Sequence, residues 1–111
     1  MEPSELETLK TLAYFYYKVN LYDSAMRTVT VMLLYAPDNV WARGMLVRCC
    51  DSLADYAKVL ELTSDMSRFD ADEAIRRAVT ALRARALLKT GKTDESMQLV
   101  KTIVPRLEED E

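Results

Sequence analysis

The stretch that most constrains the fold runs from Tyr14 to Pro37, and its sequence is YFYYKVNLYDSAMRTVTVMLLYAP. It predicts two helices joined by a tight turn. Asn20 tolerates the left-handed backbone conformation that reverses the chain after a helix. Apolar residues then recur at spacings of three and four, which places Val29 and Met32 on one face of a second helix. Pro37 lacks an amide hydrogen and disfavours the helical conformation of the residue before it, so the second helix is expected to end there.

The composition of the chain extends the helical interpretation to its whole length. Hydrophobic residues make up 50% of the 111 residues, whereas there are 2 glycines and 3 prolines, so few residues favour turns. A chain of this length forms one domain with a modest core. The sequence therefore predicts a single, almost wholly helical domain that covers residues 1–111.

Residues that cap helices indicate where the helices begin. Ser4 and Glu7 have the spacing of a capping box and predict that the first helix begins near Glu5. Asp38 and Asp70 are expected to cap the third and fifth helices. The expected helices cover residues 5–19, 22–35, 39–52, 55–66 and 71–89, and a sixth starts at 93 and is weakened or ended by Pro105.

The second part of the chain repeats the first at a fixed spacing. Tyr22 and Tyr56 lie 56 − 22 = 34 residues apart, and the turn positions Ala54 and Gly91 lie 91 − 54 = 37 residues apart. The three additional residues predict an extra turn or loop within residues 66–72. Three helical hairpins are therefore expected, over residues 5–36, 39–66 and 71–107, with an acidic tail at 108–111.

The first hairpin resembles the tetratricopeptide (TPR) repeat, whose period is 34 residues. Small residues at Ala13 and Ala25 let two helices approach closely, and Tyr16 fills the space beside them. The positions of the pattern are held by Leu9, Leu12, Ala13, Tyr16, Ala25, Val29, Met32 and Pro37, of which Leu9, Val29 and Met32 depart from its usual residues. The resemblance implies an all-α fold in which three hairpins, six helices in total, stack as a short right-handed TPR-like solenoid.

The sequence lacks the motifs that mark common catalytic and cofactor sites. The chain contains no His, no Gly-rich phosphate loop and no cysteine spacing suited to zinc. No catalytic, cofactor-binding or metal-binding residue is therefore expected, and an enzyme is the weakest hypothesis. With a net charge of −3, the protein has no positive field to attract nucleic acid. The arginines Arg76, Arg77, Arg83 and Arg85 follow a group of acidic residues and are expected to form a solvated face.

The sequence also leads to an expectation about location. The N-terminal residues lack the basic start and apolar run of a signal peptide, and no later segment approaches a membrane span. We therefore expect a cytoplasmic protein that does not insert into membranes. Cys49 and Cys50 are neighbours that point about 100° apart on a helix, so buried free thiols are expected rather than a disulfide or a metal site.

Aromatic residues are concentrated in the first helix, where residues 14–17 are Tyr, Phe, Tyr and Tyr. At about 100° per residue their side chains surround most of the helix, so one hairpin interface cannot bury all of them. In a TPR array, the first helices of the hairpins line a concave surface that binds peptides. The residues expected to face this partner-binding surface are Lys10, Tyr14, Tyr17, Trp41, Gly44, Arg48, Ala81 and Arg85. The alternative is that Tyr14 and Tyr17 pack against the second hairpin or against a second copy of the chain.

The chain also resembles small TPR-like chaperones of bacterial type III secretion systems. The resemblance is carried by residues 35–38, which are Tyr-Ala-Pro-Asp, and by the helix over residues 43–50, which is rich in arginine and aliphatic residues. The short chaperone of the YscY type is the nearest, and the needle-subunit co-chaperone of the YscG type is the second choice.

This resemblance implies a non-enzymatic, cytoplasmic chaperone that needs no cofactor. Its partner would be a small secretion-system protein, either an early substrate or the needle subunit, whose helical hydrophobic segment the aromatic groove keeps soluble. The chain is expected to form a heterodimer with that partner and a marginally stable monomer or a homodimer without it. The alternative is a general TPR adaptor within a larger assembly, which would bind short peptide tails mainly through charge.

Overall fold

The computed structural model describes residues 1–104, which contain six α-helices, one short 3₁₀-helix and no strand. The elements are α1 (Pro3–Lys18), α2 (Tyr22–Tyr35), α3 (Val40–Ser52), α4 (Tyr56–Leu62), η1 (Met66–Phe69), α5 (Glu73–Lys89) and α6 (Thr93–Ile103). The prediction of an all-helical chain with six α-helices is therefore confirmed. The expectations for Pro105, for the end of the third hairpin at residue 107 and for the tail at 108–111 lie outside the described residues.

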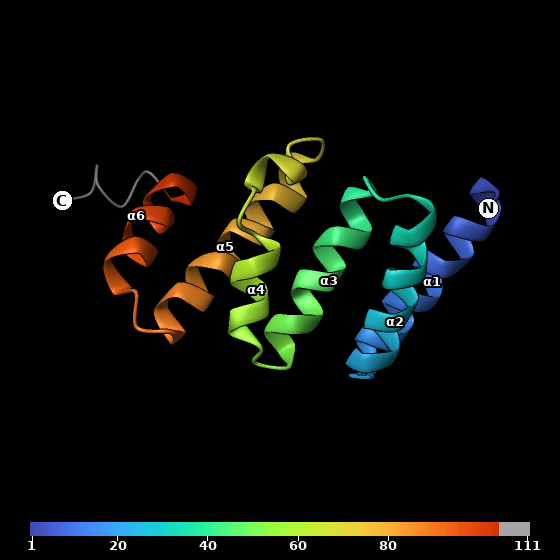
Figure 1. Cartoon of the computed structure of the whole chain (residues 1–111), viewed down its shortest axis with the longest axis horizontal. Coiled ribbons are helices and arrows are strands. Elements are labelled where there is room, and N and C mark those ends of the chain that lie inside the picture. The colour runs from blue at the N-terminus through green and yellow to red at the C-terminus, as the bar shows by residue number, and fades with distance from the viewer. Residues whose placement is uncertain (105–111) are drawn as a thin grey trace.

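The helices lie in a row that follows the order of the chain (Figure 1). The principal extents of the molecule are 50 × 25 × 23 Å, so the row is about twice as long as it is wide. Helix α2 packs between α1 and α3, α5 contacts both α3 and α4, and α6 packs on α5. Most contacts therefore join elements that are close in the sequence.

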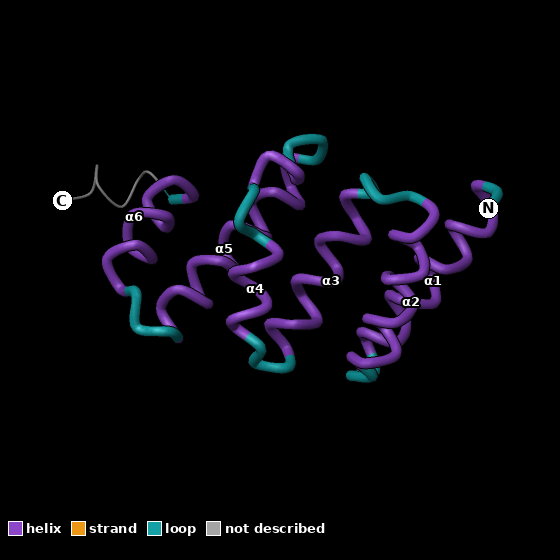
Figure 2. The backbone as a smooth tube through the Cα atoms, viewed as in Figure 1, coloured by secondary structure: helices purple, strands orange, loops and turns teal. Residues whose placement is uncertain are grey.

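One backbone motif closes the turns after α1, α3 and α5. Asn20, Ala54 and Gly91 have φ angles of 65°, 58° and 85°, which lie in the left-handed region. In each turn the next amide donates to the carbonyl five positions earlier, from Leu21 to Tyr16, from Asp55 to Cys50 and from Lys92 to Leu87, at 2.8, 2.9 and 2.8 Å. The three turns lie along the same edge of the row (Figure 2). Their spacings of 54 − 20 = 34 and 91 − 54 = 37 residues agree with the repeat found in the sequence.

Ala54 holds this conformation with a side chain that disfavours it, which leads to a prediction for stability. We expect Ala54→Gly to raise the free energy of unfolding by about 0.5–1 kcal/mol, because the left-handed conformation costs an L-residue about 1–2 kcal/mol and glycine partly regains this. Gly91→Ala is the reverse change and should lower stability by about 1 kcal/mol. A Cβ at residue 91 meets no atom within 4 Å, so the backbone conformation alone sets this cost. Urea unfolding followed by circular dichroism measures both changes, and an unchanged or lower midpoint for Ala54→Gly contradicts the argument.

The caps expected at Ser4, Asp38 and Asp70 are wrong, because neighbouring residues take the capping positions. Asn39 accepts from the amide of Ala42 at 2.9 Å, Asp72 accepts from that of Ile75 at 3.0 Å, and the amide of Glu2 donates to Glu5 at 3.5 Å. Asp38 and Asp70 instead lie inside tight turns. The amide of Asn39 donates to the carbonyl of Ala36 in the first turn, and the amide of Asp72 donates to the carbonyl of Phe69 in the second. Asn39 and Asp72 close these two turns in an extended conformation and so become the caps of the helices that follow.

The fourth helix ends at Leu62, four residues before the expected end at Met66. Asp65 accepts from the amide and the hydroxyl of Ser67, at 3.2 and 2.6 Å, and so starts a separate 3₁₀ turn. This turn places Phe69 in the core with 1% of its surface exposed. The extra turn expected within residues 66–72 is confirmed, and burial of Phe69 explains why the α-helix does not continue through it.

Two hydrophobic clusters contain most of the buried apolar residues, and α3 contributes to both. One cluster joins α1, α2 and α3, and contains Ala13, Ala25, Val29, Met32, Ala42, Met45 and Cys49. The other joins α3, α4, η1 and α5, and contains Val47, Cys50, Val59, Phe69, Val79 and Ala86. Ala13 and Ala25 are fully buried, which agrees with their expected role in the close packing of the first hairpin.

The expectation of a solvated arginine face is wrong for Arg83, which is half-buried, whereas Arg85 is exposed as expected but pairs with another helix. The Arg83 guanidinium donates to the carbonyl of Leu60 at 3.2 Å and to the hydroxyl of the buried Thr63 at 2.9 Å. Arg85 lies 3.3 Å from a carboxylate oxygen of Asp51 on α3. Both arginines therefore tie α5 to the second hairpin, and their long stems allow them to reach partners that the local sequence does not reveal.

The two cysteines are free and fully buried. Burial, with a smaller contribution from Cys50, raises the pKa of the Cys49 thiol to about 11. Burial is also the main reason that the pKa of the Cys50 thiol is raised, and the Asp55 carboxylate adds to it. Both thiols are therefore neutral and shielded in the folded protein, as expected for structural cysteines.

This burial makes the stability depend on pH above the ordinary thiol pKa. In the unfolded chain the thiols lose their protons near pH 9.0, whereas Cys49 keeps its proton to about 11 when folded. The unfolded state then binds fewer protons, so the free energy of unfolding falls as the pH rises through this window. Urea unfolding at several pH values should show a larger decrease for the wild type than for a Cys49→Ala, Cys50→Ala double variant, which controls for tyrosine and lysine titration. Equal decreases, or rapid labelling of the folded protein by a thiol reagent at neutral pH, contradict this account.

Candidate functional site

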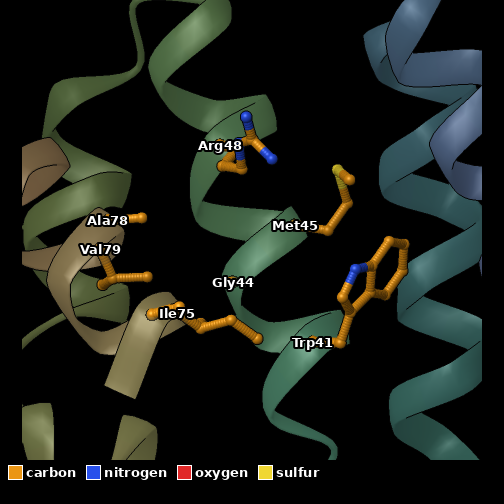
Figure 3. A pocket seen from close by; sticks show the side chains of 8 residues that line it. Trp41, Gly44, Met45, Arg48, Ile75, Ala78 and Val79 are labelled. Carbon is orange, nitrogen blue, oxygen red and sulfur yellow. The ribbon is translucent and has the colours of Figure 1, made fainter. Parts of the chain in front are cut away.

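An apolar cleft lies between α3 and α5 (Figure 3). Its volume is about 230 Å³, which is below the roughly 300–1,000 Å³ typical of small-molecule sites. We call it the α3–α5 cleft, and it is lined by Trp41, Gly44, Met45, Arg48, Ala74, Ile75, Ala78 and Val79. Arg48 is the one charged residue in this lining, so the cleft suits an apolar group with an acidic neighbour.

Gly44 allows the two helices to approach closely at the floor of the cleft. It is buried, and a Cβ added there would lie 2.9 Å from the Cγ2 methyl of Ile75. Ile75 and Val79 of α5 point toward Gly44, whereas the Trp41 ring lies on the side of α3 that faces the first hairpin (Figure 3). Because Cγ2 is a branch methyl on a stiff side chain, it cannot swing away without a change of rotamer or backbone. Glycine at this position therefore sets the depth of the cleft.

We expect Gly44→Ala to destabilise the protein only while Ile75 is present. Overpacking costs about 1–3 kcal/mol and outweighs the gain of roughly 1 kcal/mol in helix propensity. In an Ile75→Ala background the clashing methyl is gone, so Gly44→Ala should raise the stability. A double-mutant cycle by urea unfolding should give a coupling free energy of about 1 kcal/mol or more. Additive effects of the two substitutions contradict the close approach at this site.

Two cation–π contacts join α1 to α3 beside the cleft. The Lys10 ammonium lies 5.4 Å from the centre of the Trp41 ring, and the Arg48 guanidinium lies 5.1 Å from that of the Tyr17 ring. The cation is on α1 in the first contact and on α3 in the second. The spacing is equal on the two helices, since 17 − 10 = 7 and 48 − 41 = 7, so α1 and α3 run in the same direction. Four of the residues expected to bind a partner are thus brought together in pairs.

The other expected residues lie apart from the cleft. Tyr14 is 49% exposed, and its ring lies 5.8 Å from the Lys18 ammonium rather than against α3. Ala81 is exposed on α5 but does not line the cleft. Arg85 also lies outside the cleft, where it pairs with Asp51. Tyr17 contacts Tyr22 of α2 at 5.5 Å between ring centres. It also contacts Arg48 of α3, so it packs against the second hairpin, as the alternative interpretation expected.

Sequence reasoning missed the α5 side of the cleft. Ala74 and Ala78 are small, exposed residues four positions apart, and Ile75 and Val79 follow them with the same spacing. This double i, i+4 pattern places two small and two branched residues side by side on one face of a helix. It could have indicated a close helix contact, but the sequence did not show that α3 supplies the opposite wall.

Two further properties follow from the described residues. Residues 1–104 contain no group of three or more His, Cys, Asp or Glu side chains placed to hold a metal ion. In the same part of the chain, none of the helices combines the length and the hydropathy needed to cross a bilayer.

No protein-family model, curated protein or solved structure matches the chain. The resemblances to the TPR repeat and to type III secretion chaperones therefore stay predictions from the sequence.

Proposed function

We propose that the protein is a non-enzymatic chaperone or co-chaperone that binds a helical, hydrophobic segment of a small type III secretion component and keeps it soluble in the cytoplasm. The observation that carries the proposal is the α3–α5 cleft with its single cation. The secretion assignment rests on the resemblance noted in the sequence, and the peptide-binding assignment rests on the geometry of the cleft.

The size of the cleft favours one anchoring side chain of a protein partner. A volume of about 230 Å³ accepts an apolar side chain but is small for a cofactor. Binding energy between proteins is concentrated in a few apolar or aromatic anchors that fill such pockets. An amphipathic helix supplies anchors at i, i+3 and i+4, and Ala74 and Ala78 leave room for its backbone to approach.

The cations beside the cleft favour a partner with acidic residues near its anchor. Lys10 and Arg48 are held over aromatic rings, which fixes their position while leaving their charge available. A carboxylate that flanks the apolar anchor would be placed by Arg48 at the rim.

We also propose that the six helices form a short TPR-like right-handed solenoid, whose first helices line the partner-binding side. Three observations support this arrangement. The turns recur at 34 and 37 residues, α2 packs on α3 as α4 packs on α5, and α1 runs in the same direction as α3.

The test compares two alanines of α5 that are both exposed. Ala78 lines the cleft and Ala81 does not, so Ala78→Glu should fill the cleft with a charged side chain while Ala81→Glu leaves it open. Once the partner has been identified by co-purification from the native host, its affinity is measured with purified proteins. We expect Ala78→Glu to weaken binding at least about tenfold, or about 1.4 kcal/mol, and Ala81→Glu to leave it unchanged. Equal binding by the two variants places the partner elsewhere on the surface.

Salt dependence separates this proposal from a general TPR adaptor. Burial of an apolar anchor is little affected by salt, whereas a charge-led contact with peptide tails weakens strongly as salt screens it. A dedicated small partner with salt-resistant affinity supports the chaperone. Several unrelated partners released by moderate salt would support the adaptor instead.

A further inference from the structure

Exposed hydrophobic side chains are concentrated at the N-terminal end of the row. In the part of the chain that the structure describes, thirteen large hydrophobic residues are exposed, and nine of them belong to residues 1–35. Monomeric proteins expose such residues singly, and a cluster marks an interaction surface.

One stripe on α1 has the spacing of a helix-packing seam. It consists of Thr8, Leu12 and Phe15 of α1 and of Val19, the residue that follows the helix; they are separated by four, three and four residues and are all exposed. This spacing places them along one side of the helix. Two shallow hollows meet at Thr8, one lined by Leu12 and Phe15 and the other bordered by Val31 of α2. We call this stripe the open face of α1.

The equivalent stripe on α3 is covered by a helix. The 34-residue spacing relates Thr8, Leu12 and Phe15 of α1 to residues 8 + 34 = 42, 12 + 34 = 46 and 15 + 34 = 49 of α3. Ala42 and Cys49 are fully buried, and Leu46 packs with them in the cluster that α2 shares with α3. Within residues 1–104, α1 packs extensively only on α2, and no element covers its open face as α2 covers α3. The open face is therefore a surface of the type that receives an antiparallel helix.

We infer that the open face of α1 binds the open face of a second copy of the chain, with the two α1 helices antiparallel. In an antiparallel two-fold pair of helices, residues whose numbers have the same sum lie opposite each other. Because 12 + 15 = 8 + 19, Leu12 meets Phe15 of the copy in the same register in which Thr8 meets its Val19. The charges agree with this orientation, since α1 has an acidic first turn with Glu5 and a basic last turn with Lys18. Antiparallel packing brings each acidic end level with a basic end and opposes the two helix dipoles.

The N-terminal end of the row is better suited to bind a second copy than the C-terminal end. The described residues at the C-terminal end expose fewer large hydrophobic side chains, namely Leu88, Met97 and Val104. A head-to-tail contact would leave much of the open face of α1 unmatched, whereas a two-fold contact uses the larger surface twice and closes.

The inference is independent of the proposed function. Leu12 and Phe15 lie on a different side of α1 from Lys10 and Tyr17, which contact α3. A dimer formed through the open face therefore leaves both α3–α5 clefts accessible.

Light scattering coupled to size-exclusion chromatography tests the inference on the full chain. The wild type should have the mass of a dimer, and Phe15→Glu should halve it, because two carboxylates would be buried at the centre of the contact. Leu88→Glu introduces the same charge at an equally exposed leucine of α5 and should stay dimeric. A monomeric wild type, an open-ended series of larger species, or a dimeric Phe15→Glu protein overturns the inference.

Cysteine cross-linking tests the orientation and does not depend on the folding of Phe15→Glu. A mixture of Thr8→Cys and Val19→Cys proteins should form a mixed disulfide under mild oxidation, while each variant alone should not. The native thiols are fully buried and should not interfere. Cross-linking of Thr8→Cys to itself indicates parallel helices, and the absence of any cross-link indicates that the faces do not meet, so either result overturns the inference.

Discussion

Burial of α3 on two of its sides holds the two halves of the molecule together. Ala42, Met45 and Cys49 pack into the cluster of the first hairpin, while Val47 and Cys50 pack into the cluster that includes α4 and α5. A helix covered on both sides cannot carry charge on either, which explains why its arginines lie at the remaining edges. The cleft and the cation–π contacts all use those edges, so their positions follow from the packing of this one helix.

The regular parts of the fold were predictable because the backbone allows few solutions there. A tight reversal after a helix needs a left-handed residue, so Asn20 and Gly91 could be recognised, and the repeat spacing then located Ala54 as their equivalent. The caps were harder to predict, because several acidic and amide side chains lie within two residues of each helix start. Asn39 and Asp72 become caps because of the turns that precede them, and those turns could not be predicted from the local sequence.

Half of the candidate site could be derived in the same way, and the other half could not. The repeat assigns Trp41, Gly44 and Arg48 to one side of α3, and the structure places them on one wall of the cleft. The opposite wall contains Ile75 and Ala78, whose role depends on how α5 is rotated against α3. That rotation depends on long-range packing, which includes the inserted 3₁₀ turn and the contacts that arginines of α5 make with other helices. It therefore cannot be predicted from a local sequence pattern.

The arrangement of contacts between sequence neighbours also determines how the chain can fold. Each hairpin closes through its own turn, and few contacts join distant elements, which is a topology that favours fast folding. During synthesis the N-terminal hairpin emerges first. Until α3 follows, that hairpin exposes the apolar side that α3 later covers as well as the open side of α1. Translation of the next helix therefore covers one of these two apolar surfaces and leaves the open face of α1 exposed.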